Sequence, residues 1–535
     1  MLGPPASSPA RGRRSKMRRG MNLIARVDGL ALIAALATLI CAAPAFAVIG
    51  FALAPASAGL AFGADLLADG AFGTLALTLA GGSGAIVFGA ASAWLVSLCK
   101  FPGRGLFEWL LVVPLAAPSY VLAYAYAGLS WAGGISPVRI EGFWGAAFIY
   151  AMGLYPYIYL AARAAFASQS ACALEAARSL GARPLKILWR VALPLARPGI
   201  AAGAALACME IAADYGAAQH FGLTTLSTAI FRAWYAHGNP HAALQIAALL
   251  LVAALAFLSV ERRARGRASF ASGRWRQLQR YELAPLPGAA ALVFCTALVT
   301  FGAGLPLAYL ARLALVHAQV EDLARPLLNS LLLAGAGALV TLALAAAIAV
   351  AARRVDGLGK LSLFAAGMGY AAPGAVIAMG ALALFGLARA GGLVGGLGVG
   401  LTLAALLWTY AARFAAAGAQ PIDAGLARLS KGVDASARSL GAGPWRRLVR
   451  IDLPIAAPSL AAAALILFVE ILKELPATLI LRPYAFDTLA VKAYAYASDE
   501  RLLQAAAPSL LIFLAGLAPI LVLSRGLNAA RAGFR

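Results

Sequence analysis

Charged side chains are scarce in this 535-residue sequence, and acidic ones are the scarcer kind. Asp, Glu, Lys and Arg together make up 12% of the chain, whereas apolar residues make up 62%. Soluble globular domains carry about 25% charged residues, so this composition excludes a water-soluble fold. The mean hydropathy of +0.83 points the same way. The sequence is therefore that of an integral membrane protein.

Cysteine and histidine are also rare. The chain has five cysteines and four histidines, and neither type recurs at the spacing of a disulfide framework or a metal site. No His-x-x-x-His pattern is present, and no glycine-rich loop is followed by Lys-Ser or Lys-Thr. We therefore expect no resident cofactor, no bound metal, no catalytic residues and no ATP site in the chain itself.

Long apolar runs fill most of the chain. A helix needs roughly 20 apolar residues to cross a hydrocarbon core of ~30 Å, and about twelve runs reach that length. No single soluble core would hide so many. The predicted fold is all-α, with transmembrane helices at 29–55, 71–99, 106–130, 142–162, 194–215, 243–260, 286–311, 329–352, 361–387, 396–417, 456–477 and 503–524.

Basic residues cluster in alternate loops. With a cytoplasmic N-terminus, the inner loops collect the Lys and Arg residues of 11–19, 100–104, 178–190 and 262–280. This is the positive-inside bias, and it predicts a multi-pass protein with both termini in the cytoplasm. The net charge of +23 is then a topology signal and an attraction to the anionic heads of the lipid bilayer, and nucleic-acid binding is not expected.

The chain contains an internal repeat. Glu175-Ala-Ala-Arg-Ser-Leu-Gly181 and Ala435-Ser-Ala-Arg-Ser-Leu-Gly441 lie 260 residues apart, and each is followed by a Leu-Pro pair. The same offset relates Arg178 to Arg438, Pro194 to Pro454 and Glu210 to Glu470. We expect two tandem halves, 1–270 and 271–535, with six spans each. Six spans place both copies in the same orientation, so an axis along the membrane normal should relate them and a path should run between them.

The repeated segment lies in a basic loop on the expected cytoplasmic side. A carboxylate at Glu175 suits the positive end of a helix, and the small Ala176 and Ala177 allow a partner to approach closely. Gly181 permits a turn that needs no side chain, and Pro184 starts a second, amphipathic helix. We expect helix, glycine turn, helix, and therefore a docking surface that the chain uses twice.

At these residues the sequence resembles a known family. The pattern EAARSLG…LP, present once per half, resembles the cytoplasmic motif of binding-protein-dependent ABC importer permeases. The resemblance implies a bacterial inner-membrane permease, a periplasmic binding protein, and two copies of a separate ATPase that dock on coupling loops at 170–194 and 430–454. The implied docking residues are Glu175, Ala176, Ala177, Gly181 and Pro194 in the first loop, and Asp434, Ala435, Ala437, Gly441 and Pro454 in the second.

The second loop departs from the family pattern. Ala435 takes the glutamate position, Asp434 stands one place earlier, and Ser436 replaces the middle alanine. We therefore expect the two docking sites to be unequal.

An apolar span after each loop carries acidic residues four positions apart. These candidate path residues are Glu210, Asp214, Glu470 and Glu474. Residues at i and i+4 share a helix face, and a charge at the centre of a bilayer costs ~2.5–3.5 kcal/mol on insertion scales, so they should face a wet interior. Two roles stay open: contact with cargo, or local bonding, such as Glu470 with Lys473 or caps on broken helix ends.

The expected cargo is a cation. Carboxylate oxygens suit a hard metal ion such as ferric iron, and the segments 214–231 and 473–494 resemble the fused permeases of ferric iron importers. Thiamine or another small cationic solute is the alternative cargo. An ion-coupled secondary transporter is the alternative class, but it gives no reason to repeat the cytoplasmic loop. A membrane enzyme would need a cluster of nucleophile, base or metal ligands, which the sequence does not show.

Overall fold

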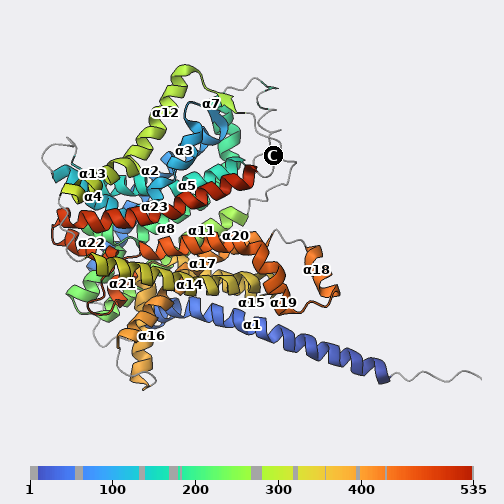
Figure 1. The fold of residues 1–535 in the computed structure, drawn as a ribbon. Coiled ribbons are helices and arrows are strands. Elements are labelled where there is room, and N and C mark those ends of the chain that lie inside the picture. Colours follow the sequence, from blue (N-terminus) through green and yellow to red (C-terminus); the bar gives the residue numbers. More distant parts are fainter. Residues whose placement is uncertain are drawn as a thin grey trace, which may run out of the picture.

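The computed structural model describes residues 10–54, 64–131, 139–167, 177, 179–180, 184–266, 280–316, 323–355, 357–392, 398–427 and 431–532 (Figure 1). In these ranges the chain is helical, apart from one pair of two-residue parallel strands, β1 (Cys99–Lys100) and β2 (Tyr281–Glu282). The predicted all-α membrane fold is confirmed.

The elements follow one another as helices joined by short turns, with η marking 3₁₀ and π segments. The first half contains α1 (Ala10–Ala52), α2 (Ala64–Leu98), α3 (Arg104–Leu110), η2 (Val113–Ala116), α4 (Ser119–Trp131), α5 (Gly142–Ala167), α7 (Pro184–Ile187), η3 (Leu188–Ala192), α8 (Leu193–Ala213), α9 (Gly216–His220), α10 (Leu226–Phe231), η4 (Arg232–Ala236) and α11 (Pro240–Gly266). The second half contains α12 (Pro285–Val299), η5 (Thr300–Gly304), α13 (Leu305–Val316), α14 (Ala324–Arg354), α15 (Leu358–Ala371), α16 (Gly374–Ala390), α17 (Val399–Leu426), α18 (Lys431–Ser439), α19 (Pro444–Arg447), η6 (Leu448–Asp452), α20 (Leu453–Leu472), α21 (Pro476–Leu481), α22 (Leu489–Ser498) and α23 (Leu502–Ala532).

The helices match the predicted spans, except that two spans are bent and the apolar part of the last is shorter than predicted. Among the described residues, nine helices are long and apolar enough to cross a membrane, and two bent pairs raise the number to eleven. The last predicted span, 503–524, falls on α23, whose apolar stretch Leu502–Leu517 is shorter. The spans predicted at 106–130 and 361–387 are each a broken pair of helices, because the chain bends there by 91° and 111°.

Both bends occur at an Ala-Ala-Pro sequence. Proline disfavours the helical conformation of the residue before it, and Ala117 and Ala372, which precede Pro118 and Pro373, are both extended, with ψ of 118° and 133°. The helix therefore stops and restarts in a new direction. Each half thus contains one broken span.

The two halves interlock. The first helix of the first half, α1, packs on α14, α15, α16 and α17 of the second half, whereas α12 and α13 of the second half pack on α2, α3 and α4 of the first. Figure 1 shows α1 beside α15, and α12 beside α2 and α3. Each half therefore covers apolar surface of the other.

A repeated hydroxyl contact fixes the end of the bundle that lies opposite α18 and α19. The Leu226 amide at the start of α10 donates to the Thr74 hydroxyl at 2.8 Å, and the Leu489 amide at the start of α22 donates to the Ser330 hydroxyl at 2.7 Å. Both contacts satisfy a backbone amide that a helix start leaves without an internal partner. The duplication therefore extends to the segments that follow the acidic residues.

Candidate translocation site

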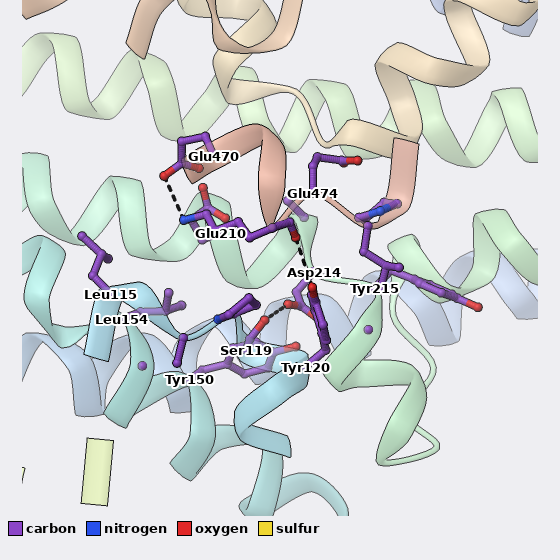
Figure 2. Close-up of a pocket in the computed structure, with 18 of the residues that line it drawn as sticks. Leu115, Ser119, Tyr120, Tyr150, Leu154, Glu210, Asp214, Tyr215, Glu470 and Glu474 are labelled. Carbon is purple, nitrogen blue, oxygen red and sulfur yellow. Dashed lines mark hydrogen bonds and ion pairs between the residues drawn. The ribbon is translucent and has the colours of Figure 1, made fainter. Parts of the chain in front are cut away.

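A cavity of about 90 Å³ lies between the two halves. All four carboxylates singled out in the sequence line it (Figure 2). The other polar side chains on its wall are Ser119, Tyr120, Tyr150, Tyr157, Tyr215, Arg413 and Lys473. The structure thus brings together residues that are 260 positions apart in the chain.

Glu474 is held by several contacts and is nearly inaccessible. Its carboxylate pairs with Arg413 at 2.9 Å and accepts the backbone amides of Ala477 and Thr478, each at 3.1 Å. Its side chain is 2% exposed and that of Arg413 is 12% exposed. Gly374 makes room for this pair, because a Cβ there would lie 2.0 Å from Arg413 Nη1. Glu474 therefore joins the end of α20, the start of α21, α17 and the bend before α16.

Asp214 makes the corresponding connection in the first half without a cation. Its carboxylate accepts the Ser119 hydroxyl and, at 2.8 Å, the Ala217 amide, and it has no ion pair among the described residues. These contacts tie the start of α4 to the turn between α8 and α9. The expectation that Asp214 and Glu474 share a helix face with the acids before them needs correction, because α8 ends at Ala213 and α20 at Leu472.

Glu210 and Glu470 remain on helices and face the cavity. Glu470 pairs with Lys473 at 2.8 Å, and the two side chains are 15% and 18% exposed. Glu210 has no hydrogen bond or ion pair with any residue in the described ranges, although it lines the same wall. It is therefore the carboxylate best placed to receive a group from outside the chain.

The basic residues of the cavity belong to one half. At the offset of 260, the counterpart of Arg413 is Gly153 and that of Lys473 is Ala213, and both of these small residues line the cavity. The wall thus holds four carboxylates and two cations, and each cation is already paired with a carboxylate. Carboxyl groups therefore outnumber basic side chains on this wall by two.

A larger cavity, of about 430 Å³, adjoins this one near α22 and the start of α5. Tyr124, His220, Glu141 and Glu500 line it, and Gly216 lines both cavities. A Cβ on Gly216 would lie 2.7 Å from Tyr120 Cβ and 3.2 Å from Leu475 Cδ2. The backbone at Gly216 therefore forms the wall between the two cavities, where a side chain has no room.

Those of the predicted ATPase-docking residues that the structure describes lie before or at the start of α8 and α20, at the ends away from this site. Glu175, Ala176 and Gly181 are outside the described residues, and Ala177 is half-buried. In the second loop, Asp434 and Ala435 belong to α18, Ala437 is buried, and Gly441 turns the chain with φ of +76°. Pro194 and Pro454 stand in the first turn of α8 and α20. The helix, glycine turn and helix are thus present in the second loop.

Several features of the site escaped the sequence interpretation. Both loops enter their span through a π segment, η3 and η6, and no residue pattern announces it. The Ala-Ala-Pro sequence at the two broken spans is not a signal for them, because the same sequence lies inside the continuous helices α1, at Pro44, and α20, at Pro458. Arg413 had a signal, because a basic residue in an apolar span is costly unless it is paired.

Comparison with known proteins identifies the fold's family. The family model of the binding-protein-dependent transport system inner membrane component matches residues 85–262. The Fe(3+)-transport system permease protein FbpB 2 of Haemophilus influenzae is 25% identical over 454 residues, which cover 83% of this chain and 87% of that protein. The chain is a binding-protein-dependent ABC permease.

Two further relatives match the permease over shorter stretches. The molybdenum transport system permease protein ModB of Escherichia coli is 30% identical over 25% of this chain and 62% of its own length. The sulfate transport system permease protein CysT of Synechococcus elongatus is 33% identical over 23% of this chain and 46% of its own length. The permease is therefore a multi-pass component of the bacterial inner membrane and is not itself catalytic.

Proposed function

We propose that this permease imports a cation, ferric iron in the first place, delivered by a periplasmic binding protein. The observation that carries the proposal is the cavity between the halves, where four carboxylates face two cations that are already paired. The similarity to an Fe(3+)-transport permease over most of both chains supports iron.

The chemistry of the wall favours a hard cation. Carboxylate and phenol oxygens are the ligands that such ions prefer, and Tyr120, Tyr150 and Tyr157 stand beside the acids. An oxyanion such as sulfate or molybdate is repelled by carboxylates and is attracted most strongly by unpaired basic side chains. Both basic side chains on this wall, Arg413 and Lys473, are bound to carboxylates, so the site supports an anion less well.

The energy is proposed to come from a separate ATPase, with one copy at each coupling loop. Figure 1 shows α18 and α19 at the end of the bundle opposite α21 and α22. That arrangement fits a cytoplasmic docking surface at one end and a cargo entrance at the other. Both chain termini are then cytoplasmic, in agreement with the distribution of basic residues.

The test is uptake by the permease reconstituted in sealed liposomes with its binding protein outside and its ATPase inside. We expect uptake of iron that requires internal ATP and falls in Glu210→Gln. Glu282→Gln is the matched control, because Glu282 is an exposed carboxylate outside the cavity. Uptake driven by an ion gradient without the ATPase would indicate a secondary transporter. Uptake of molybdate or sulfate instead of iron would show that the cargo is an oxyanion and not ferric iron.

A further inference from the structure

The two cations of the cavity are held in different ways. Arg413 is paired with Glu474, a carboxylate that two backbone amides and the Thr478 hydroxyl also fix in place. Lys473 has one ion pair in the described part of the chain, with Glu470, and both partners retain contact with the cavity. Arg413 is thus held by a carboxylate that is itself fixed in place, whereas the Lys473 ammonium can leave its carboxylate.

We propose that Lys473 is a resident cation of the translocation cavity, which occupies Glu470 until a multivalent cargo cation displaces it. This inference rests on the proposed function, namely that the cargo is a cation. Cargo meets the unpaired Glu210 first and then takes over Glu470, while the lysine side chain swings away. Lys473 thereby helps to decide which cations the permease accepts.

The physical reason is competition between a tethered charge and a free one. The ammonium group is attached three residues from Glu470, so its effective concentration there is high. A free monovalent ion carries the same charge as the lysine ammonium, so it has no advantage over the lysine in binding the carboxylate. Because Coulomb attraction grows with the charge of the ion, a multivalent cation shared by Glu210 and Glu470 gains more than the lysine does. Abundant monovalent ions are therefore kept out of an acidic cavity.

The position of Lys473 suits this role. It directly follows the last residue of α20, where the chain turns toward α21, and its long, flexible side chain reaches back to Glu470. The counterpart in the first half, Ala213, has no charge, so Glu210 stays open. A lysine at a helix C-terminus also stabilises the helix dipole, and that simpler role predicts a change in stability without a change in cation binding.

Terbium binding to the purified permease in lipid nanodiscs tests the proposal without any cargo transport. Tb³⁺ is a hard trivalent cation, and excited tyrosines near it sensitise its luminescence, so the tyrosines of the wall report on this cavity. Lys473→Met removes the charge and keeps most of the stem. We expect it to bind Tb³⁺ about tenfold more tightly, or about 1.4 kcal/mol, and to show new competition by Na⁺. Ala213→Lys, which adds a second resident cation beside Glu210, should weaken binding by a similar factor.

Unchanged Tb³⁺ affinity and unchanged Na⁺ competition in Lys473→Met would overturn the proposal, and a lower melting temperature with unchanged binding would leave only the helix-capping role. If Lys473→Met does not fold, Lys473→Gln takes its place with the same expected result. Failure of the proposed function looks different: Glu210→Gln then leaves iron uptake unchanged, while Lys473→Met abolishes uptake of an oxyanion.

Discussion

The two halves of this permease present the same carboxylates in different electrostatic settings. In the first half, Glu210 has no partner in the described residues and Asp214 is held by a hydroxyl and an amide. In the second half, Glu470 and Glu474 each have a basic partner. The duplication kept the acids and diverged in the cations. Under the proposed function, the first half receives the charge of the cargo and the second half supplies the lysine that competes with it.

A similar difference separates the segments η3 and η6, which follow the two proposed coupling loops. Asp452, in η6, pairs with Arg354 at the end of α14, whereas the counterpart of Asp452 in η3 is the uncharged Ala192. The second coupling loop thus has an ionic link to its own half at a position where the first loop has an alanine. Any motion that the ATPase imposes on the loops should therefore enter the two halves through different contacts.

The largest expected effect comes from breaking the buried pair of the second half. Arg413→Ala leaves Glu474 as an uncompensated charge in a nearly inaccessible site, and losing one partner of a buried pair costs about 3–5 kcal/mol. We expect little folded permease, measured as the monodisperse fraction in detergent and as the unfolding midpoint. Adding Glu474→Gln should recover part of the loss. The comparison is Asp214→Asn in the first half, which removes no ion pair. An equal loss of folded permease in that variant would contradict the difference between the halves.

The next effect concerns the wall between the two cavities. Gly216→Ala places a methyl group against Tyr120 and Leu475, and such overpacking typically costs about 1–3 kcal/mol. We expect iron uptake to fall strongly while ATPase association is retained. Gly335→Ala is the control, because a Cβ there meets nothing within 4 Å. Normal uptake in Gly216→Ala would show that this wall does not gate the passage.

The docking loops should differ by a smaller amount. A hydrogen bond to a charged group contributes about 1.5–3 kcal/mol, and only the first loop carries the glutamate at the family position. Glu175→Ala should therefore loosen ATPase association more than Asp434→Ala, measured by co-purification or by a binding titration. Gly181→Val and Gly441→Val, which attack the turn of each loop, should impair coupling about equally. Equal effects of the two acidic substitutions would remove the predicted asymmetry.

The smallest effect is expected at the strand pair β1 and β2. Lys100 donates a hydrogen bond to Glu282 and lowers the pKa of that carboxyl below its ordinary value. The stabilisation is present at neutral pH, above the ordinary pKa, and is lost as the pH falls through the lowered pKa. Because the pair is exposed and screened by salt, Glu282→Gln should leave uptake and the neutral-pH melting temperature nearly unchanged. A marked loss of uptake or a marked drop in melting temperature at neutral pH would show that this ion pair between the halves contributes more than its exposure suggests.

The sequence predicted the parts of the fold that depend on local pattern. Apolar length located the spans, and the repeat at Gly181 and Gly441 predicted two tandem halves. The bends were missed because proline alone does not decide them: Pro156 and Pro421 lie inside the unbroken helices α5 and α17, whereas Pro118 and Pro373 end a helix. The difference lies in tertiary contacts, since Asp214 accepts the Ser119 hydroxyl directly after one of these bends.

The residue types of the site and one local pair, Glu470 with Lys473, were expected from the sequence, but the pairing of Glu474 was not. The four carboxylates that follow the repeated loops stood out because charge is costly in an apolar span, and all four line one cavity. Which of them is open and which is paired depends on Arg413, which is 61 residues from Glu474 in the chain. Two partners so far apart in the chain leave no local sequence pattern. Only the packed structure therefore shows that Glu474 is paired, whereas Glu210 has no partner in the described residues.

Iron uptake by Glu210→Gln, set beside Glu470→Gln in the same reconstituted system, tests the central claim most directly. Glu210 is the open carboxylate of the first half, and Glu470 is the one that Lys473 neutralises at rest. The account predicts that Glu210→Gln lowers ATP-dependent uptake at least about tenfold, a loss of about 1.4 kcal/mol, and that Glu470→Gln lowers it less. Uptake that is unchanged in Glu210→Gln, in a permease that still folds and binds its ATPase, would contradict it.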